Sequence, residues 1–147
     1  MFKICYTYVE NCRKEIAMIK KCDLTLKSIV DGAENLFCVE GRLEDHAGKV
    51  KVCYREDPAI VHIVFSAQGE ANIEREGDYT LRLPLKQGES TQGELGINGN
   101  TGDLGICTHY VEYTFTEVGL SARLRYDLLL GEDVQEMELQ IQANARK

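Results

Sequence analysis

Cys107 and His109 form the residue pair in this 147-residue chain that comes closest to a catalytic arrangement. Both lie in a segment in which polar and apolar residues alternate, so they project from one face of a strand, with about 6.6 Å between their backbones. A cysteine nucleophile also needs a base in hydrogen-bond contact and a third group that orients this base. The sequence offers no such group. We therefore expect Cys107 to pack in the core and His109 to lie beside a polar partner in the interior.

Metal ligands are present, but they are scattered along the chain. The six cysteines stand at positions 5, 12, 22, 38, 53 and 107, without a CxxC pair. His62 could join Cys107 and His109 at a zinc ion, but the neighbouring Val61 and Ile63 indicate a lone histidine within an apolar strand. The carboxylates form no pair in an apolar setting either. We predict no metal site, no cofactor and no catalytic residue.

Arg75 is the charged residue best suited to hold a ligand. It shares a predicted strand face with Ala71 and Ile73, and a buried guanidinium requires an anion as its partner. That anion is either a protein carboxylate or a ligand headgroup held by two hydrogen bonds; alternatively, Arg75 braces a turn at the end of a strand. Tyrosines on the predicted inward faces add apolar bodies with polar tips. The predicted ligand-binding residues are Arg75, His109, Tyr79, Tyr113 and Tyr126.

Glycines recur at every third position from 93 to 105. A phosphate-binding loop would require a lysine at the start of a helix, and this segment contains none. Asn98-Gly99 is a strong turn signal. The segment predicts a flexible hairpin loop, with a mobile lid over a barrel mouth as the alternative.

The chain as a whole is acidic, but its N-terminal segment is basic. The net charge is −7, but residues 1–21 contain five Lys or Arg against two Glu. The acidic remainder disfavours nucleic acids and anionic membranes. No apolar run has the roughly 20 residues of a membrane span or the 7–15 of a signal-peptide core. We therefore expect a cytoplasmic protein with reduced cysteines.

Alternation of polar and apolar residues, typical of strands, dominates the chain after Lys21. From Leu120 to Leu130 every second residue is apolar; Gly131-Glu132-Asp133 then forms a turn, and Met137, Leu139 and Ile141 resume the pattern. Similar segments follow one another with short connections, too short for parallel crossovers. Pro84 places one of these strands at an edge or a bulge. The pattern predicts an all-β, antiparallel up-and-down barrel of about 8–10 strands, with a two-sheet sandwich as the alternative.

The domain organisation follows from the same pattern. Residues 22–147 are predicted to form the barrel domain, and residues 1–21 an N-terminal extension. Val9, Cys12, Ile16 and Ile19 recur at helical spacing, which favours a short N-terminal helix. Met18 directly precedes the first alternating segment, so a translation start at Met18 is the alternative.

The order and spacing of several motifs resemble the uncharacterised bacterial family of YwiB-like proteins. These motifs are residues 73–77, 81–88, 101–108, 119–130 and 137–141. The resemblance implies a calycin-like (lipocalin-like) β-barrel and no established activity.

Two functions fit a barrel of this kind. The first is a binding module that holds a small apolar, amphipathic or anionic-headed ligand in the barrel, because such a barrel is wide enough for one small molecule. The second is a non-enzymatic protein–protein interaction module with a solidly packed barrel, which binds a protein partner or a second copy. An enzyme is the third possibility, and it would require a polar cluster inside the barrel.

Overall fold

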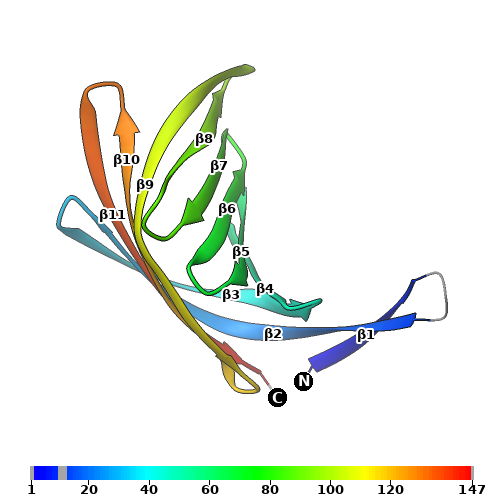
Figure 1. Cartoon of the computed structure of the whole chain (residues 1–147). Helices are drawn as coiled ribbons and strands as arrows, with labels where there is room; N and C mark the ends of the chain where they lie inside the picture. Colours follow the sequence, from blue (N-terminus) through cyan, green and yellow to red (C-terminus); the bar gives the residue numbers. More distant parts are fainter. Residues whose placement is uncertain (1, 10–12, 147) are drawn as a thin grey trace.

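The structure is a computed structural model that describes residues 2–9 and 13–146, with side chains described from residue 19 onward. Within these residues, eleven strands form one antiparallel sheet (Figure 1). They are β1 (Phe2–Val9), β2 (Arg13–Val30), β3 (Ala33–His46), β4 (Lys49–Glu56), β5 (Ala59–Ala67), β6 (Glu70–Glu76), β7 (Tyr79–Lys86), β8 (Ser90–Ile97), β9 (Asn100–Thr116), β10 (Gly119–Leu130) and β11 (Asp133–Ala145).

Ten of these strands close into an up-and-down barrel, as the sequence predicts. Strands β3 to β11 pair with their neighbours in chain order, and β2 closes the ring because it pairs with β3 on one side and β11 on the other. The connections are tight turns, many with a glycine at positive φ. From β2 onward, each strand therefore pairs with the next strand along the chain. One closed sheet results, and the sandwich alternative does not apply.

The N-terminal segment is extended, so the predicted short helix is wrong. Strand β1 pairs with the first part of β2, from Phe2↔Lys20 to Val9↔Arg13. The backbone groups of both segments therefore form a sheet ladder, which a helical spacing of a few apolar residues does not outweigh. Cys12, one of the residues behind that prediction, lies outside the described residues. The barrel pairing of β2 with β3 begins at Met18↔Asp45.

The inward faces carry the core. Leu124, Tyr126 and Leu128 keep only 0, 4 and 7% of their surface exposed, which confirms the inward face predicted for this strand. The largest side chains with less than 2% exposure come from seven of the strands: Cys22, Leu24, Leu43, Val52, Ile63, Phe65, Leu83, Ile106, Val111, Leu120 and Leu124.

The glycine-rich segment forms the hairpin that Asn98-Gly99 predicts, but the residues on both sides of this turn belong to strands and not to a loop. Residues 90–97 form β8, and Asn98-Gly99, both at positive φ, make a two-residue turn into β9. A Cβ on Gly93 would clash with the Arg82 carbonyl oxygen of β7. Glycine here permits a close approach of neighbouring strands.

Two irregularities shape the sheet. Pro84 pairs with Asn72 of β6, but the pairing of β7 with β8 stops at Arg82↔Glu94, so the missing N–H of Pro84 interrupts no ladder. In β9 the register with β10 shifts between Arg125 and Tyr126, which leaves His109 as the extra residue of a bulge.

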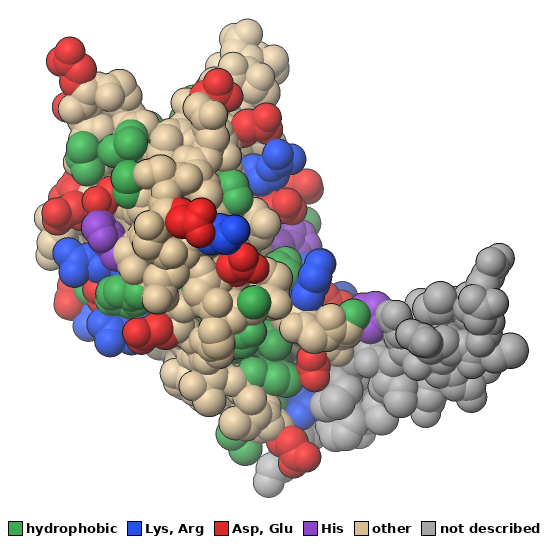
Figure 2. All heavy atoms as spheres, in the orientation of Figure 1, with side chains coloured by type: hydrophobic (Ala, Val, Ile, Leu, Met, Phe, Trp, Pro, Cys, Tyr) green, Lys and Arg blue, Asp and Glu red, His purple; other side chains and the backbone are tan. Residues whose placement is uncertain are grey.

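The two ends of the barrel differ. We call the end that carries the turns at Gly32, Pro58, Gly77, Gly99 and Gly131 the mouth, and the opposite end the base. Figure 2 shows the molecule hollowed at the mouth, between two projections that correspond to the β8–β9 and β10–β11 tips in Figure 1. Seven exposed large apolar side chains lie toward the mouth: Leu36, Phe37, Tyr79, Ile97, Leu129, Leu130 and Val134. Among the described residues, no helix has the length and apolar character needed to cross a membrane.

Candidate ligand-binding site

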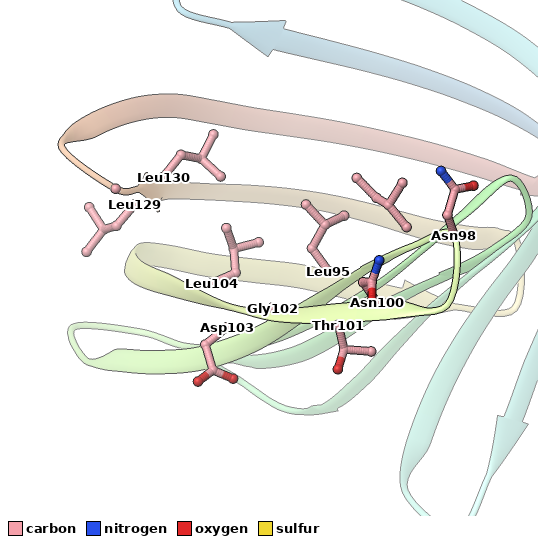
Figure 3. Close-up of a pocket in the computed structure, with 11 residues that line it drawn as sticks. Leu95, Asn98, Asn100, Thr101, Gly102, Asp103, Leu104, Leu129 and Leu130 are labelled. Atoms are coloured by element: carbon pink, nitrogen blue, oxygen red, sulfur yellow. The ribbon is translucent and has the colours of Figure 1, made fainter.

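A pocket of about 590 Å³ opens at the mouth between the tips of two hairpins. We call it the mouth pocket. Its wall consists of Leu95, Ile97, Asn98, Asn100, Thr101, Gly102, Asp103, Leu104, Leu129, Leu130 and Gly131. In Figure 3 the side chains of Leu95, Leu104, Leu129 and Leu130 gather on the same side of the β8–β9 hairpin. The mouth pocket is therefore an apolar surface within a largely acidic molecule.

The register of three neighbouring strands creates this pocket. Pairing between β9 and β10 ends at Gly105↔Leu129. Beyond that point β9 continues to pair with β8 as far as Asn100↔Ile97, and β10 with β11 as far as Leu130↔Asp133. The two hairpins therefore separate, and apolar residues from both of them line the space between them.

Polar groups stand at one side of the mouth pocket. Asn98 lies in the β8–β9 turn and Asn100 follows it, and their amides can both donate and accept hydrogen bonds. Asp103 and Thr101 point away from the leucines, to the other side of the hairpin (Figure 3). An occupant would thus meet leucine side chains and neutral amides, with the single wall carboxylate turned away.

Arg75 braces a turn, which is one of the roles that the sequence predicts for it. Its Nη1 donates to the Asp78 carboxylate at 3.1 Å and to the Tyr79 carbonyl at 3.0 Å. The side chain is 12% exposed, and its guanidinium lies 3.8 Å above the centre of the Tyr79 ring. The hydrogen bond from Arg75 lowers the pKa of Asp78. The anion that a buried guanidinium requires is therefore supplied by the protein.

The three predicted tyrosines occupy different positions. Tyr126 is buried, and this burial raises the pKa of its hydroxyl. Tyr113 is half-buried toward the base, with its ring centre 4.8 Å from that of Phe65. Tyr79 is 37% exposed and pairs with Ile97, which lines the mouth pocket.

His109 and Cys107 lie on the outer face of β9, and not in the core. The bulge turns His109 outward, and its Nε2 lies 2.9 Å from Oδ2 of Asp127. Cys107 is half-buried, with its Sγ 3.4 Å from the Ser90 hydroxyl. The polar partner expected for His109 therefore exists, but it lies on the outer surface of the barrel.

Metal ligands do not converge in the part of the chain that the structure describes. No group of three or more His, Cys, Asp or Glu side chains there could hold a metal ion. His62 is half-buried, with no hydrogen-bond partner at its buried Nδ1.

The residues of the mouth pocket differ from the predicted binding residues. The polar chemistry of their side chains favours Arg75, His109, Tyr79, Tyr113 and Tyr126, whereas the apolar part of the pocket wall consists of four leucines and Ile97. One sequence signal could have indicated it. Leu128-Leu129-Leu130 breaks the alternation of β10, so this strand end is apolar on both faces.

The barrel and its pocket define a class of small, closed, antiparallel β-barrels with an apolar mouth. The chain belongs to the family described as "Domain of unknown function (DUF1934)", whose model matches residues 25–141. It is also similar to the solved "Crystal structure of ywiB protein from Bacillus subtilis", with a TM-score of 0.75 and 18% identity over 88% of this chain and 94% of that chain. This likeness confirms the predicted YwiB-like fold, and it shows the fold alone. A search of curated proteins gives no match.

Proposed function

We propose that this protein is a non-enzymatic binding module that holds a small molecule with an apolar body and a neutral polar end in the mouth pocket. One observation carries the proposal: a pocket of about 590 Å³ walled by four leucines and Ile97 at the open end of an otherwise acidic barrel. Pockets of roughly 300–1,000 Å³ with apolar walls and a few polar groups are typical of small-molecule sites.

The packing of the barrel supports a site at the mouth. Phe65, Ile63 and Leu43 are fully buried toward the base, so large side chains occupy that part of the interior. In contrast, a Cβ added to Gly102 in the pocket wall would meet nothing within 4 Å. The space available to an occupant thus lies between the two hairpin tips.

The charges near the mouth favour a neutral polar end over an anionic headgroup. Arg75 is already paired with Asp78, and Asp103 is the charged residue in the pocket wall. The amides of Asn98 and Asn100 can bind a hydroxyl, carbonyl or amide group of the occupant. Tyr79, next to Ile97 across β7 and β8, is the predicted binding residue best placed to extend the site.

Titration with a neutral, environment-sensitive apolar dye such as Nile red tests the proposal. The wild-type protein should bind the dye saturably, and Leu130→Asp, which places a charge in the pocket wall, should weaken binding at least about tenfold. Leu36→Asp is the matched control, because Leu36 is 69% exposed and lies outside the pocket wall. It should bind the dye like the wild type.

Two outcomes would contradict the proposal. Dye binding that is absent from the wild type, or that both variants weaken equally, would exclude the mouth pocket as the site. A mass that rises with concentration in light scattering, and that Leu130→Asp returns to that of a monomer, would assign the mouth to a second copy. That outcome would support the interaction-module alternative.

We also propose the cytoplasm as the location of this module. The cysteines described in the structure, Cys22, Cys38, Cys53 and Cys107, are free thiols. Free thiols are typical of a reducing compartment.

A further inference from the structure

A row of basic residues crosses the outer face of three neighbouring strands, away from the mouth pocket. Lys21 of β2 pairs with Arg42 of β3, and Arg42 pairs with Cys53 of β4. Residues that are direct partners in neighbouring strands have Cβ atoms about 4.5–5.5 Å apart. Arg55 follows Cys53 by two positions, so it projects from the same face.

These residues surround a second pocket, which we call the basic pocket. Its volume is about 270 Å³, and its wall consists of Lys21, Glu40, Gly41, Arg42, Cys53, Tyr54 and Arg55. Glu40, the acidic residue of this wall, is paired with Arg146 from the end of the chain. Arg146 also binds Asp23, so it offsets the charge of Glu40 only in part.

The charge balance here is the reverse of the balance of the whole chain. Arg55 has a loose ion pair with Asp57, at 3.7 Å, in which both side chains are largely exposed. Among the described residues, Lys21 and Arg42 have no carboxylate within ion-pair distance. In the whole chain, by contrast, 24 carboxylates outnumber 17 Lys and Arg. Unpaired basic residues around a pocket are unexpected in such an acidic protein.

We propose that the basic pocket binds a small anion, a carboxylate or a phosphate. The planar guanidinium of Arg42 can hold two oxygens of such an anion at once, and Lys21 and Arg55 add positive charge on either side. The thiol of Cys53 lies in the same wall. Burial raises the pKa of this thiol, so it stays neutral and does not repel an anion.

Alkylation of Cys53 provides a direct readout of this pocket. Iodoacetate is an anion and iodoacetamide is its neutral counterpart, so the ratio of their rates reports the local charge. Mass spectrometry of peptides measures this ratio separately at Cys53 and at Cys38, an exposed cysteine on the outer face of β3. We expect a higher ratio at Cys53 than at Cys38.

Matched charge variants test the residues involved. Arg42→Gln should lower the ratio at Cys53 at least about threefold, whereas Arg82→Gln, on the outer face of β7, removes the same charge outside the pocket and should leave the ratio unchanged. Lys21→Gln serves as a second variant if Arg42→Gln does not fold. Inorganic phosphate or benzoate should slow the alkylation of Cys53 by neutral iodoacetamide.

The two anions distinguish the two sources of negative charge. Protection by phosphate identifies a phosphate ligand, and protection by benzoate alone identifies a carboxylate ligand. Equal ratios in the Arg42→Gln and Arg82→Gln proteins, or protection of Cys53 by neither anion, would overturn the proposal. Since the basic pocket is separate from the mouth pocket, neither result depends on dye binding.

Discussion

Single glycines in the segment from 93 to 105 have different physical roles, although their spacing makes them look alike. A Cβ at Gly93 would clash with the Arg82 carbonyl oxygen and would also lie 3.1 Å from Cδ1 of Ile106. A Cβ at Gly102 would enter open space in the wall of the mouth pocket. Neither glycine has a positive φ, so contacts alone separate them.

Alanine substitutions at these two positions should therefore differ in stability. We expect Gly93→Ala to lower the free energy of unfolding by about 2 kcal/mol, because the strands around it must move apart. Gly102→Ala should change it by less than about 0.5 kcal/mol, since the new methyl group meets no neighbour. Urea denaturation followed by fluorescence measures both values. Equal losses of stability would show that strand propensity, and not close packing, explains these glycines.

The positions of some of the predicted binding residues follow from the sequence, and the positions of others do not. The alternation of β10 correctly placed Tyr126 inside the barrel, and the preference of buried guanidinium groups for an anion correctly anticipated a partner for Arg75. The outward position of His109 was not predictable, because it depends on a bulge whose place is set by pairing with β10.

At the scale of elements, β2 pairs with different strands along its length. Its first part pairs with β1, and the part from Met18 onward pairs with β3 and, from Cys22, with β11. The sequence predicts an N-terminal extension with a helix up to residue 21, whereas β2 continues through this position as one strand. Most of the strands were predictable from alternation, whereas β8 was missed because Gly93 and Gly96 interrupt its pattern.

Deletion of residues 1–17 should leave the barrel folded. The deletion keeps the barrel pairings of β2, from Met18↔Asp45 and Cys22↔Ala145 onward. We expect the far-UV circular dichroism spectrum to stay β-type and the melting temperature to shift by less than about 4 °C.

Deletion of residues 1–26 is the control for this experiment. It also removes Cys22, Leu24 and Leu26, which are buried, and it opens the barrel between β3 and β11. This chain should not fold. Loss of structure after the shorter deletion would mean that the β1–β2 pairing contributes to the stability of the barrel.

At the scale of the whole molecule, the barrel is packed in its interior and opens at the mouth. The short connections restrict neighbouring strands to antiparallel pairing, which is why the fold class was predictable from the sequence. The pocket was not, because it depends on the residue at which β9 and β10 separate, and register is not encoded in alternation alone.

The closure of the ring also places Arg146 beside Asp23, which lowers the pKa of that exposed carboxyl group through their hydrogen bonds.

Ionisable side chains buried in the interior should lower the stability of the folded protein at alkaline pH. Burial raises the pKa of Cys22 to about 11 and raises the pKa values of Tyr54 and Tyr126 above their usual 10. Below about pH 8 these groups are largely neutral in both the folded and the unfolded chain. As the pH rises further, the unfolded chain loses these protons first, so the free energy of unfolding should fall as pH approaches the folded-state values.

Tyr126→Phe isolates one part of this effect, because it keeps the buried ring and removes the ionisable hydroxyl. We expect wild-type stability, measured by urea denaturation, to fall from pH 8 to pH 11, and the fall to be about 1 kcal/mol smaller in Tyr126→Phe. The comparison cancels the titration of surface lysines, which both proteins share. An identical fall in the two proteins would mean that the Tyr126 hydroxyl reaches water in the folded state, and therefore that the space at the mouth extends deeper into the barrel than its packed side chains indicate.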